Sequence, residues 1–287
     1  MTLGTQRRTR QRTHVTGAAS SGVRQVLEAP RRPARVLAAF PRCVYLEIRT
    51  EREPTTIAVI TGDATRLPNS LLTAGELPQV TVGDEAAVGD GSVELGSQSL
   101  RARRWWDPAP PLPPVDLREL AGSRLRLNAY QGRTPGLVGN EAVALLTEGC
   151  AAGSLVDSIT AAERLIGLGP GLTPSGDDVL AGVLLALRHL GAAARVGRAV
   201  WLADWLATTV TFDARTRTTP ISATLLYCAA RGEASPEVTE VLRALAESRP
   251  PEAALGRLDR LGHTSGADLT QGLRIGVTSV LTLSGTE

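Results

Sequence analysis

The pattern of hydrophobic and polar residues changes near Trp106, and this change predicts two domains. Before it, short β-branched or aromatic runs are bounded by turn residues, which is typical of strands. These runs cover residues 36–48, 56–61, 80–93 and 100–106. Gly-Asp pairs inside the third run are hairpin signals. We therefore expect a small antiparallel β-domain over residues 23–106.

Beyond Trp106 the pattern becomes mainly helical. Residues 107–115, Asp-Pro-Ala-Pro-Pro-Leu-Pro-Pro-Val, predict a proline-rich connector. Hydrophobic residues then recur at helical spacing, and within residues 196–210 both leucines and tryptophans stand four apart, which indicates packing and no chemistry. Residues 116–287 are expected to form a helical domain, so the predicted fold class is α+β.

The helical part is organised around the stretch from Gly167 to Leu187. Its first half, Gly-Leu-Gly-Pro-Gly-Leu-Thr-Pro, has glycines that permit positive φ and prolines that exclude a regular helix or central strand. Ser175 stands three residues before Asp178, the spacing of a capping box, so we expect Ser175 to cap a helix. Residues 179–187 are apolar in nearly every direction, which predicts a buried helix.

The same device occurs again near the C-terminus. Ser-Gly-x-Asp-xxx-Gly at residues 175–182 aligns with Ser-Gly-x-Asp-xxx-Gly at residues 265–272, an offset of 90 residues. Each copy predicts a loop that ends at a capped helix, with a glycine one turn in where another helix packs closely. The two copies have two possible interpretations. Both could be well-capped helices of the core, or they could form a ligand site.

Two residues go beyond what capping requires. Asp177 adds a second carboxylate beside Asp178, and the helix dipole offsets their repulsion only in part. His263 directly precedes the second cap and is one of three histidines. A glycine-rich loop before a helix favours anions because free N–H groups point outward. Two carboxylates there indicate either a divalent cation or substrate N–H groups, and the sequence leaves both open.

Two other polar stretches supply candidate ligands. Residues 213–222 read Asp-Ala-Arg-Thr-Arg-Thr-Thr-Pro-Ile-Ser and precede a helix. Their arginines and hydroxyls could bind an oxyanion through Arg215, Arg217, Thr218, Thr219 and Ser222. The loop at residues 131–136, Gln-Gly-Arg-Thr-Pro-Gly, could carry a further arginine to a site.

Composition narrows the chemistry. All 31 basic residues are arginine, at a net charge of +2, so a Walker-type lysine, a Schiff-base lysine and a lysine general base are excluded. Three widely spaced cysteines argue against a disulfide framework or zinc site and for a reducing compartment, which predicts a cytoplasmic protein.

The N-terminal residues are basic, and the chain has no apolar run of membrane-spanning length. We expect residues 1–22 to be a disordered basic tail, because no hydrophobic segment follows to make a signal peptide. Nucleic-acid binding by this tail is not favoured, since few aromatic residues accompany its arginines.

Three segments together resemble the AllH family. They are Gly-Leu-Gly-Pro-Gly-Leu-Thr-Pro-Ser-Gly-Asp-Asp at residues 167–178, Thr-Thr-Pro-Ile-Ser at 218–222 and Gly-His-Thr-Ser-Gly-Ala-Asp at 262–268. The resemblance covers roughly residues 30–285 and leaves out the basic tail. Thr264 departs from the pattern, because serine is more often expected there.

The resemblance implies a part in carbamoyl transfer. The family is associated with oxamate carbamoyltransferase, a three-component enzyme of anaerobic allantoin breakdown. It implies reversible reaction of carbamoyl phosphate with oxamate to give oxalurate and phosphate. Two other protein subunits are implied as partners and no cofactor is required, although Mg²⁺ remains an option. A carbamoyl phosphate or ureide ligand is implied, with no membrane partner.

Carbamoyl transfer needs anion clamps and dipoles aimed at the carbonyl oxygen. We expect backbone amides of Gly169, Gly171 and Gly176, with Thr173, to bind an oxyanion. Arg215 or Arg217 would be a clamp, Asp177 and Asp178 would bind an amide or a metal, and His263 would carry a proton. The expected binding set also includes Ser175, Thr218, Thr219, Ser222, Thr264, Ser265 and Asp268.

Two other functions fit the same motifs. In a noncatalytic assembly subunit, the motifs would be tightly packed helix starts buried against partner proteins. In a nucleotide-dependent phosphotransferase, the glycine loop would hold phosphates, and Asp177 and Asp178 would hold magnesium. The lack of lysine weakens this second alternative.

Overall fold

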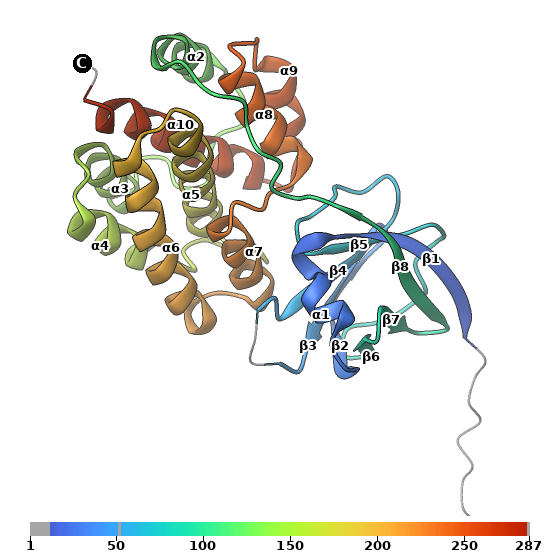
Figure 1. The fold of residues 1–287 in the computed structure, drawn as a ribbon. Coiled ribbons are helices and arrows are strands. Elements are labelled where there is room, and N and C mark those ends of the chain that lie inside the picture. The colour runs from blue at the N-terminus through green and yellow to red at the C-terminus, as the bar shows by residue number, and fades with distance from the viewer. Residues whose placement is uncertain (1–11, 51–52, 286–287) are drawn as a thin grey trace, which may run out of the picture. The chain divides into compact units, whose positions relative to one another are not determined.

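The structure, a computed structural model, describes residues 12–50 and 53–285 (Figure 1). The chain divides into two compact units. The first runs to Arg66 and resumes over Ser70–Trp106, and the second comprises Leu67–Asn69 and the residues from Asp107 onward. Each unit has a hydrophobic core of its own.

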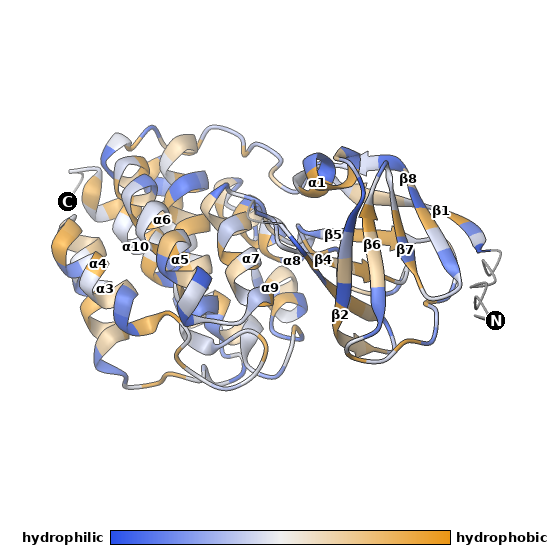
Figure 2. Ribbon diagram, turned by 90° about the horizontal axis from the view of Figure 1, so that it is seen from below, coloured by the Kyte–Doolittle hydropathy of each residue, from blue (hydrophilic) through white to orange (hydrophobic). Residues whose placement is uncertain are grey.

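Eight strands of the first unit form a closed barrel. Their bounds are β1 Thr13–Ser20, β2 Arg32–Phe40, β3 Cys43–Ile48, β4 Thr56–Ile60, β5 Ser70–Thr73, β6 Glu85–Gly89, β7 Ser92–Leu95 and β8 Gln98–Trp106. A short 3₁₀ turn, Ser21–Val23, and helix α1, Arg24–Glu28, follow β1. Buried and less buried residues alternate along β3, as a one-sided core requires, and Figure 2 shows the same alternation of hydropathy on the barrel strands.

The predicted antiparallel β-domain is wrong in topology, although the α+β class holds. The barrel order is β1-β5-β4-β3-β2-β6-β7-β8, and two of its pairs are parallel: β1 with β8, and β4 with β5. The β1 to β8 pair closes the barrel along the full length of β1. Hairpin signals reveal local antiparallel pairs, whereas a parallel pair between the first and last strands leaves no local signal.

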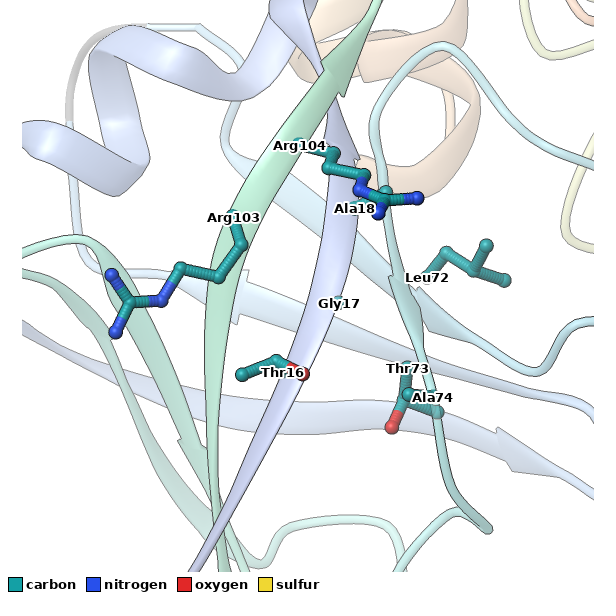
Figure 3. A pocket seen from close by; sticks show the side chains of 8 residues that line it. All are labelled: Thr16, Gly17, Ala18, Leu72, Thr73, Ala74, Arg103 and Arg104. Atoms are coloured by element: carbon teal, nitrogen blue, oxygen red, sulfur yellow. The ribbon is translucent and has the colours of Figure 1, made fainter.

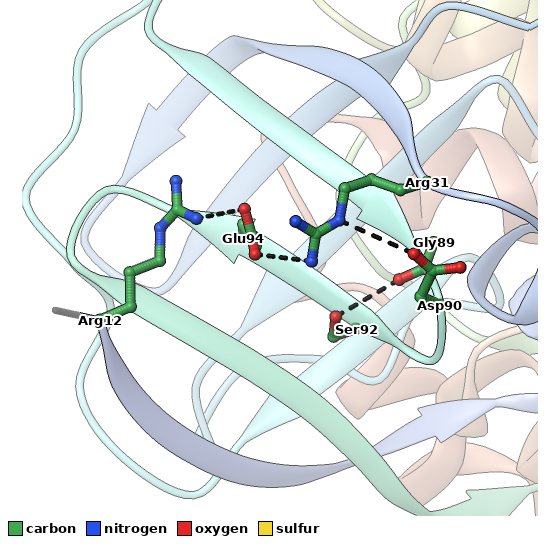
Figure 4. A network of polar contacts seen from close by, with 6 residues as sticks. All are labelled: Arg12, Arg31, Gly89, Asp90, Ser92 and Glu94. Carbon is green, nitrogen blue, oxygen red and sulfur yellow. Dashed lines mark hydrogen bonds and ion pairs between the residues drawn. The ribbon is translucent and has the colours of Figure 1, made fainter. Parts of the chain in front are cut away.

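Strand β1 also corrects the predicted tail, because Thr13–Ser20 are part of the barrel. Residues 1–11 of that tail lie outside the described residues. At the start of β1, the Glu94 carboxylate lies between two guanidinium groups, those of Arg12 and Arg31 (Figure 4). The Arg31 Nη2 to Glu94 Oε1 distance is 2.6 Å. This network joins the beginning of β1 to β7.

A cavity of about 370 Å³ lies in the barrel unit where β1 changes register (Figure 3). A Cβ atom at Gly17 would lie 2.0 Å from the backbone oxygen of Leu72, so the two strands approach too closely there for a side chain. Figure 3 shows Arg104 reaching across β1 while Arg103 points to the other side. The lining is Thr16, Gly17, Ala18, Leu72, Thr73, Ala74, Arg103 and Arg104.

The second unit is helical. Its helices are α2 Leu117–Ala129, α3 Glu141–Ala152, α4 Leu155–Leu165, α5 Ser175–Ala193, α6 Gly197–Arg217, α7 Pro220–Ala230, α8 Pro236–Ala246, α9 Glu252–Leu258 and α10 Ser265–Leu283. Helix α5 is central and contacts α4, α6, α7, α8 and α10. It is buried from Ser175 through Leu187, as its apolar sequence predicts. Within the described part of the chain, no helix is long and apolar enough to cross a membrane.

The proline-rich segment belongs to the helical unit. The Pro108 carbonyl accepts a hydrogen bond from Ala234 N at 2.9 Å, and Val115 N donates to the Ala193 carbonyl at 3.1 Å. These two bonds fix the segment to the end of α5 and the start of α8.

Helices α5 and α10 pack with their backbones nearly in contact. A Cβ atom at Gly182 would lie 2.9 Å from Gly272 Cα, and one at Gly276 would lie 2.5 Å from Ala186 Cβ. Both pairs are residues 90 apart, so the helices run in the same direction with matching registers. The glycine one turn into each motif is therefore where the two motif helices meet each other.

The expected serine caps are wrong in detail. Pro174 and Thr264 occupy the N-cap positions of α5 and α10, and neither helix has a side-chain cap bond. Ser175 and Ser265 are instead the first helical residues, and their hydroxyls bond to residues of the other motif copy. Residues 213–217 also differ from the sequence reading, since α6 continues through Arg217.

Candidate functional site

The two copies of the motif are joined at their helix starts. Thr173 Oγ1 and Ser265 Oγ share a hydrogen bond at 3.1 Å, and Ser175 Oγ and Thr264 Oγ1 share one at 3.4 Å. In both pairs the first residue comes from the loop or start of α5 and the second from the start of α10. Two helix N-termini therefore lie side by side and present their positive dipole ends together.

A third segment, the loop at residues 131–139, lies against both helix starts. Gly136 N donates to Asp268 Oδ1 at 2.7 Å, and a Cβ atom at Gly136 would lie 2.2 Å from Ser175 Oγ. Arg133 Nη1 donates to the carbonyls of Gly262 and His263 at 3.1 and 3.4 Å. The arginine of this loop thus reaches the second motif, and a larger residue at position 136 would force the Ser175 hydroxyl to move.

Asp177 is buried and hydrogen-bonded on all sides. Its side chain is 1% exposed and accepts from Gly167 N at 2.8 Å, from Ser222 Oγ at 2.6 Å and from Thr218 Oγ1. Burial raises the pKa of Asp177, and the three hydrogen bonds oppose that rise. This carboxylate joins the loop before α5 to the start of α7.

Within the two motif copies, Asp178 and Asp268 each keep one carboxyl oxygen without a hydrogen-bond partner among the described residues. They are 8% and 0% exposed, and in each the Oδ2 atom has no hydrogen-bond partner among the described residues. Burial, together with the charges of Asp268 and Asp177, holds the pKa of Asp178 well above its usual range. Hydrogen bonds from Ser265 and Thr173 work in the opposite direction. Buried polar atoms are normally paired, so two free oxygens here indicate where a ligand would bind.

The glycine-rich loop has the backbone shape that its composition predicts. Gly169 has φ of +117°, a conformation that other residues rarely adopt, and it lies close to Ser175 N. Gly171 is exposed at the tip of the loop. Gly176 differs from the expectation, because its N–H donates to the Leu168 carbonyl at 2.9 Å and a Cβ atom there would lie 2.0 Å from Leu165 O. Its role in the structure is close packing.

Some polar residues at the end of α6 and the start of α7 form hydrogen bonds within the structure, and others are exposed to solvent. Thr219 caps α7 by accepting from Ser222 N at 3.1 Å, and it donates to the Leu172 carbonyl at 2.5 Å. Arg215 and Arg217 lie exposed in the last turn of α6, where Arg217 pairs with Asp213 at 3.4 Å. In the described structure, neither the Arg215 nor the Arg217 guanidinium forms an ion pair with Asp178 or Asp268.

His263 is exposed beside Thr264, at the mouth of the site. The sequence analysis did not predict that Gly136 N donates to Asp268. It also did not predict that the charge of Asp268 acts on Asp178. The offset of 90 residues between these aspartates was the signal for the second point. In the residues described, no group of three or more His, Cys, Asp and Glu side chains is arranged to hold a metal ion.

The segment that forms this site also matches a known family. The sequence model of one family, described as oxamate carbamoyltransferase subunit AllH, matches residues 165–277. Residues 165–277 are AllH-like. The resemblance drawn from the three motifs is confirmed over this segment, and as a subunit family AllH implies other protein subunits. No solved structure matches the chain.

Proposed function

We propose that this chain is a subunit of a carbamoyltransferase resembling oxamate carbamoyltransferase, and that its site at the starts of α5 and α10 binds oxamate and its carbamoylated product, oxalurate. One observation carries the proposal. The AllH-like segment places two buried carboxyl groups, Asp178 and Asp268, with one free oxygen each beneath exposed loops.

The geometry suits oxamate or oxalurate. Both molecules have N–H groups next to a carboxylate, so each needs hydrogen-bond acceptors at one end and positive potential at the other. The free oxygens of Asp178 and Asp268 are the acceptors. The paired helix N-termini supply the positive potential for the carboxylate or for a phosphate.

In the forward direction, the proposed reaction forms one C–N bond and breaks one C–O bond. The oxamate nitrogen forms a bond to the carbamoyl carbon, while the bond from that carbon to the phosphate oxygen breaks and phosphate leaves with the electron pair. The nitrogen loses a proton, which a free oxygen of the carboxyl pair can accept. The reaction needs no redox cofactor. Asp177 already accepts three hydrogen bonds, which favours a substrate amide over Mg²⁺ beside Asp178.

Replacing Asp268 by alanine is expected to lower activity at least tenfold, because the substrate N–H loses a buried acceptor. Oxalurate phosphorolysis, measured as carbamoyl phosphate formed, is the assay, and the chain is combined with the two other subunits. Glu163→Ala is the control, since Glu163 is an exposed acidic residue on α4, away from the site and from the aromatic surface of α6. Unchanged activity of a folded Asp268→Ala protein would favour the noncatalytic assembly subunit instead. Stabilisation of the chain by Mg²⁺ with a nucleotide, and not by carbamoyl phosphate, would favour the phosphotransferase.

Helix α6 has an aromatic surface suited to a partner subunit. Trp201, Trp205 and Phe212 lie on one face and are 48%, 50% and 76% exposed. The two indole rings are 6.4 Å apart. The predicted packing residues of this helix are divided, because the leucines Leu202 and Leu206 are buried in the core and the two tryptophans are exposed. Exposed aromatic clusters of this kind mark protein interfaces.

We assign this α6 surface to a different subunit with an acidic rim, and not to a second copy. Arg198 and Arg215 stand at the two ends of the stripe, and both are exposed without an ion pair in the described residues. A twofold pairing of α6 with itself, antiparallel, would bring Arg198 of one copy near Arg215 of the other. Like charges across an interface disfavour that pairing, and acidic residues on another protein favour the alternative.

The variant Trp201→Ser with Trp205→Ser should lose affinity for the other subunits at least tenfold while it stays folded, because two aromatic anchors are removed. Pull-down and size-exclusion chromatography measure the effect. Phe40→Ser is the control, as Phe40 is a comparably exposed aromatic residue of the barrel. Equal complex formation by the double variant would refute the assignment. So would a dimer of the chain alone that the substitutions dissociate.

A further inference from the structure

The packing of α5 against α10 places Asp178 and Asp268 opposite each other. Asp178, Gly182 and Ala186 are four residues apart along one stripe of α5, and α10 has the matching stripe 90 residues later. The second and third positions of the two stripes are in contact, as the close approach at Gly272 and Gly276 shows. The first positions are the two aspartates, one turn nearer the helix N-termini.

Each of the two aspartates has one carboxyl oxygen that accepts hydrogen bonds and one that has no partner in the described part of the chain. Asp268 Oδ1 is held by Gly136 N at 2.7 Å, and Asp178 is hydrogen-bonded by Ser265 and Thr173. Each Oδ2 atom remains without a partner in the described structure. The charged groups that act on Asp178 are Asp268 on α10 and Asp177 on its own helix. Two buried carboxylates so placed are not both ionised at low cost, and one proton relieves their repulsion.

We propose that Asp178 and Asp268 share a single proton and together bind a planar amide or ureido group, the protonated carboxyl donating to its C=O oxygen and the carboxylate accepting its N–H. This inference rests on the proposed function, in which the ligand is oxamate or oxalurate and has an amide group. The inference adds which atoms of the amide group the two carboxyl groups would bind. The pair offers one donor and one acceptor side by side, which is the complement of an amide edge.

Other ligand classes fit this arrangement less well. A divalent cation would displace the shared proton and would meet two helix N-termini, which disfavour positive charge. A phosphate would face the remaining carboxylate. An amide satisfies both free oxygens without any added charge.

The shared proton has a consequence for stability without any ligand. Because the pKa of Asp178 is raised in the folded chain, its contribution to stability is complete at acidic pH and is lost as pH rises through the folded value. The melting temperature of the wild-type chain should therefore fall with rising pH relative to Asp178→Asn. In Asp268→Asn the opposing charge is gone, so the pKa of Asp178 is less raised and the fall is smaller.

Thermal melting of the full chain at several pH values between 4 and 9 tests the pair, with Glu163→Gln, at an exposed position of α4, as the control for a surface change. The expected result is a pH-dependent loss of stability in wild type and Glu163→Gln that is reduced in Asp268→Asn and reduced in Asp178→Asn. An Asp268→Asn profile parallel to wild type would show that Asp178 titrates independently, and the shared proton would be excluded.

Calorimetry with oxamate and oxalate tests the ligand class, because oxalate has the same shape and lacks the N–H groups. Oxamate should bind at least tenfold more tightly than oxalate. If N-carbamoylglycine binds and oxamate does not, the recognition chemistry stands and the proposed substrate fails. If the melting profiles show coupling but none of these amides binds, the ligand part of the inference is overturned.

Discussion

Replacing Gly272 by alanine should destabilise the helical unit by roughly 3 kcal/mol, the upper end of what overpacking a core costs. A Cβ atom at this position would lie 2.1 Å from the Val179 carbonyl oxygen and 2.9 Å from Gly182 Cα. Both neighbours are backbone atoms of a buried helix, so no flexible side chain can move aside. The two helices must separate, and the core that α5 forms with its neighbours is then lost in part. Chemical denaturation monitored by circular dichroism measures the change.

Gly122→Ala is the matched control for this substitution. Gly122 lies inside α2 with no heavy atom within 4 Å of a Cβ atom placed there. Alanine is the better helix former, so the control should be more stable than wild type by roughly 0.5–1 kcal/mol. A Gly272→Ala protein as stable as the control would mean that the contact between α5 and α10 is looser than described.

Asp177→Ala should cost roughly 3–5 kcal/mol, because one buried and two half-buried donors lose their common acceptor. The donors are Gly167 N, Thr218 Oγ1 and Ser222 Oγ. They come from the loop before α5 and from the start of α7, so their release should loosen both segments. Equilibrium unfolding gives the total cost, and hydrogen exchange at residues 167–171 locates it.

A double-mutant cycle with Ser222→Ala identifies the cause. If the cost arises from donors left without an acceptor, Asp177→Ala should be less harmful in a chain that already lacks the Ser222 hydroxyl. Strictly additive effects would show that the Ser222 hydroxyl and Asp177 do not act together. Glu163→Ala, at an exposed position of α4, is expected to change stability by less than about 0.5 kcal/mol.

The sequence revealed the helical unit more fully than the barrel. Helices have local periodicity, and both motif copies could be aligned residue by residue before any contact was known. Strand β1 was missed because its partners are far along the chain: β5, antiparallel, and β8, which is parallel to it and pairs Thr13 with Gln98. A pairing of that kind depends on tertiary packing, so the arginine-rich start of the chain indicated a tail instead.

The sequence predicts which residues belong to the candidate site, but it does not predict which of them bond to each other. Asp177 and Asp178 are adjacent in sequence and point to different partners, one to α7 and the other to α10. Ser175 has the spacing of a cap, yet its hydroxyl bonds to Thr264. Such choices are decided by which element packs on each helix face, and the spacing of residues along one helix does not contain that information.

The parallel packing of α5 and α10 gives one chain the geometry of a symmetric dimer. In a dimer of identical subunits, any substitution alters both halves of the central site at once. Here the halves are encoded separately, and they have already diverged: Thr173 and Pro174 occupy the positions that correspond to His263 and Thr264. A site of this kind can bind a ligand whose two ends differ, because each half can be adjusted to one end alone.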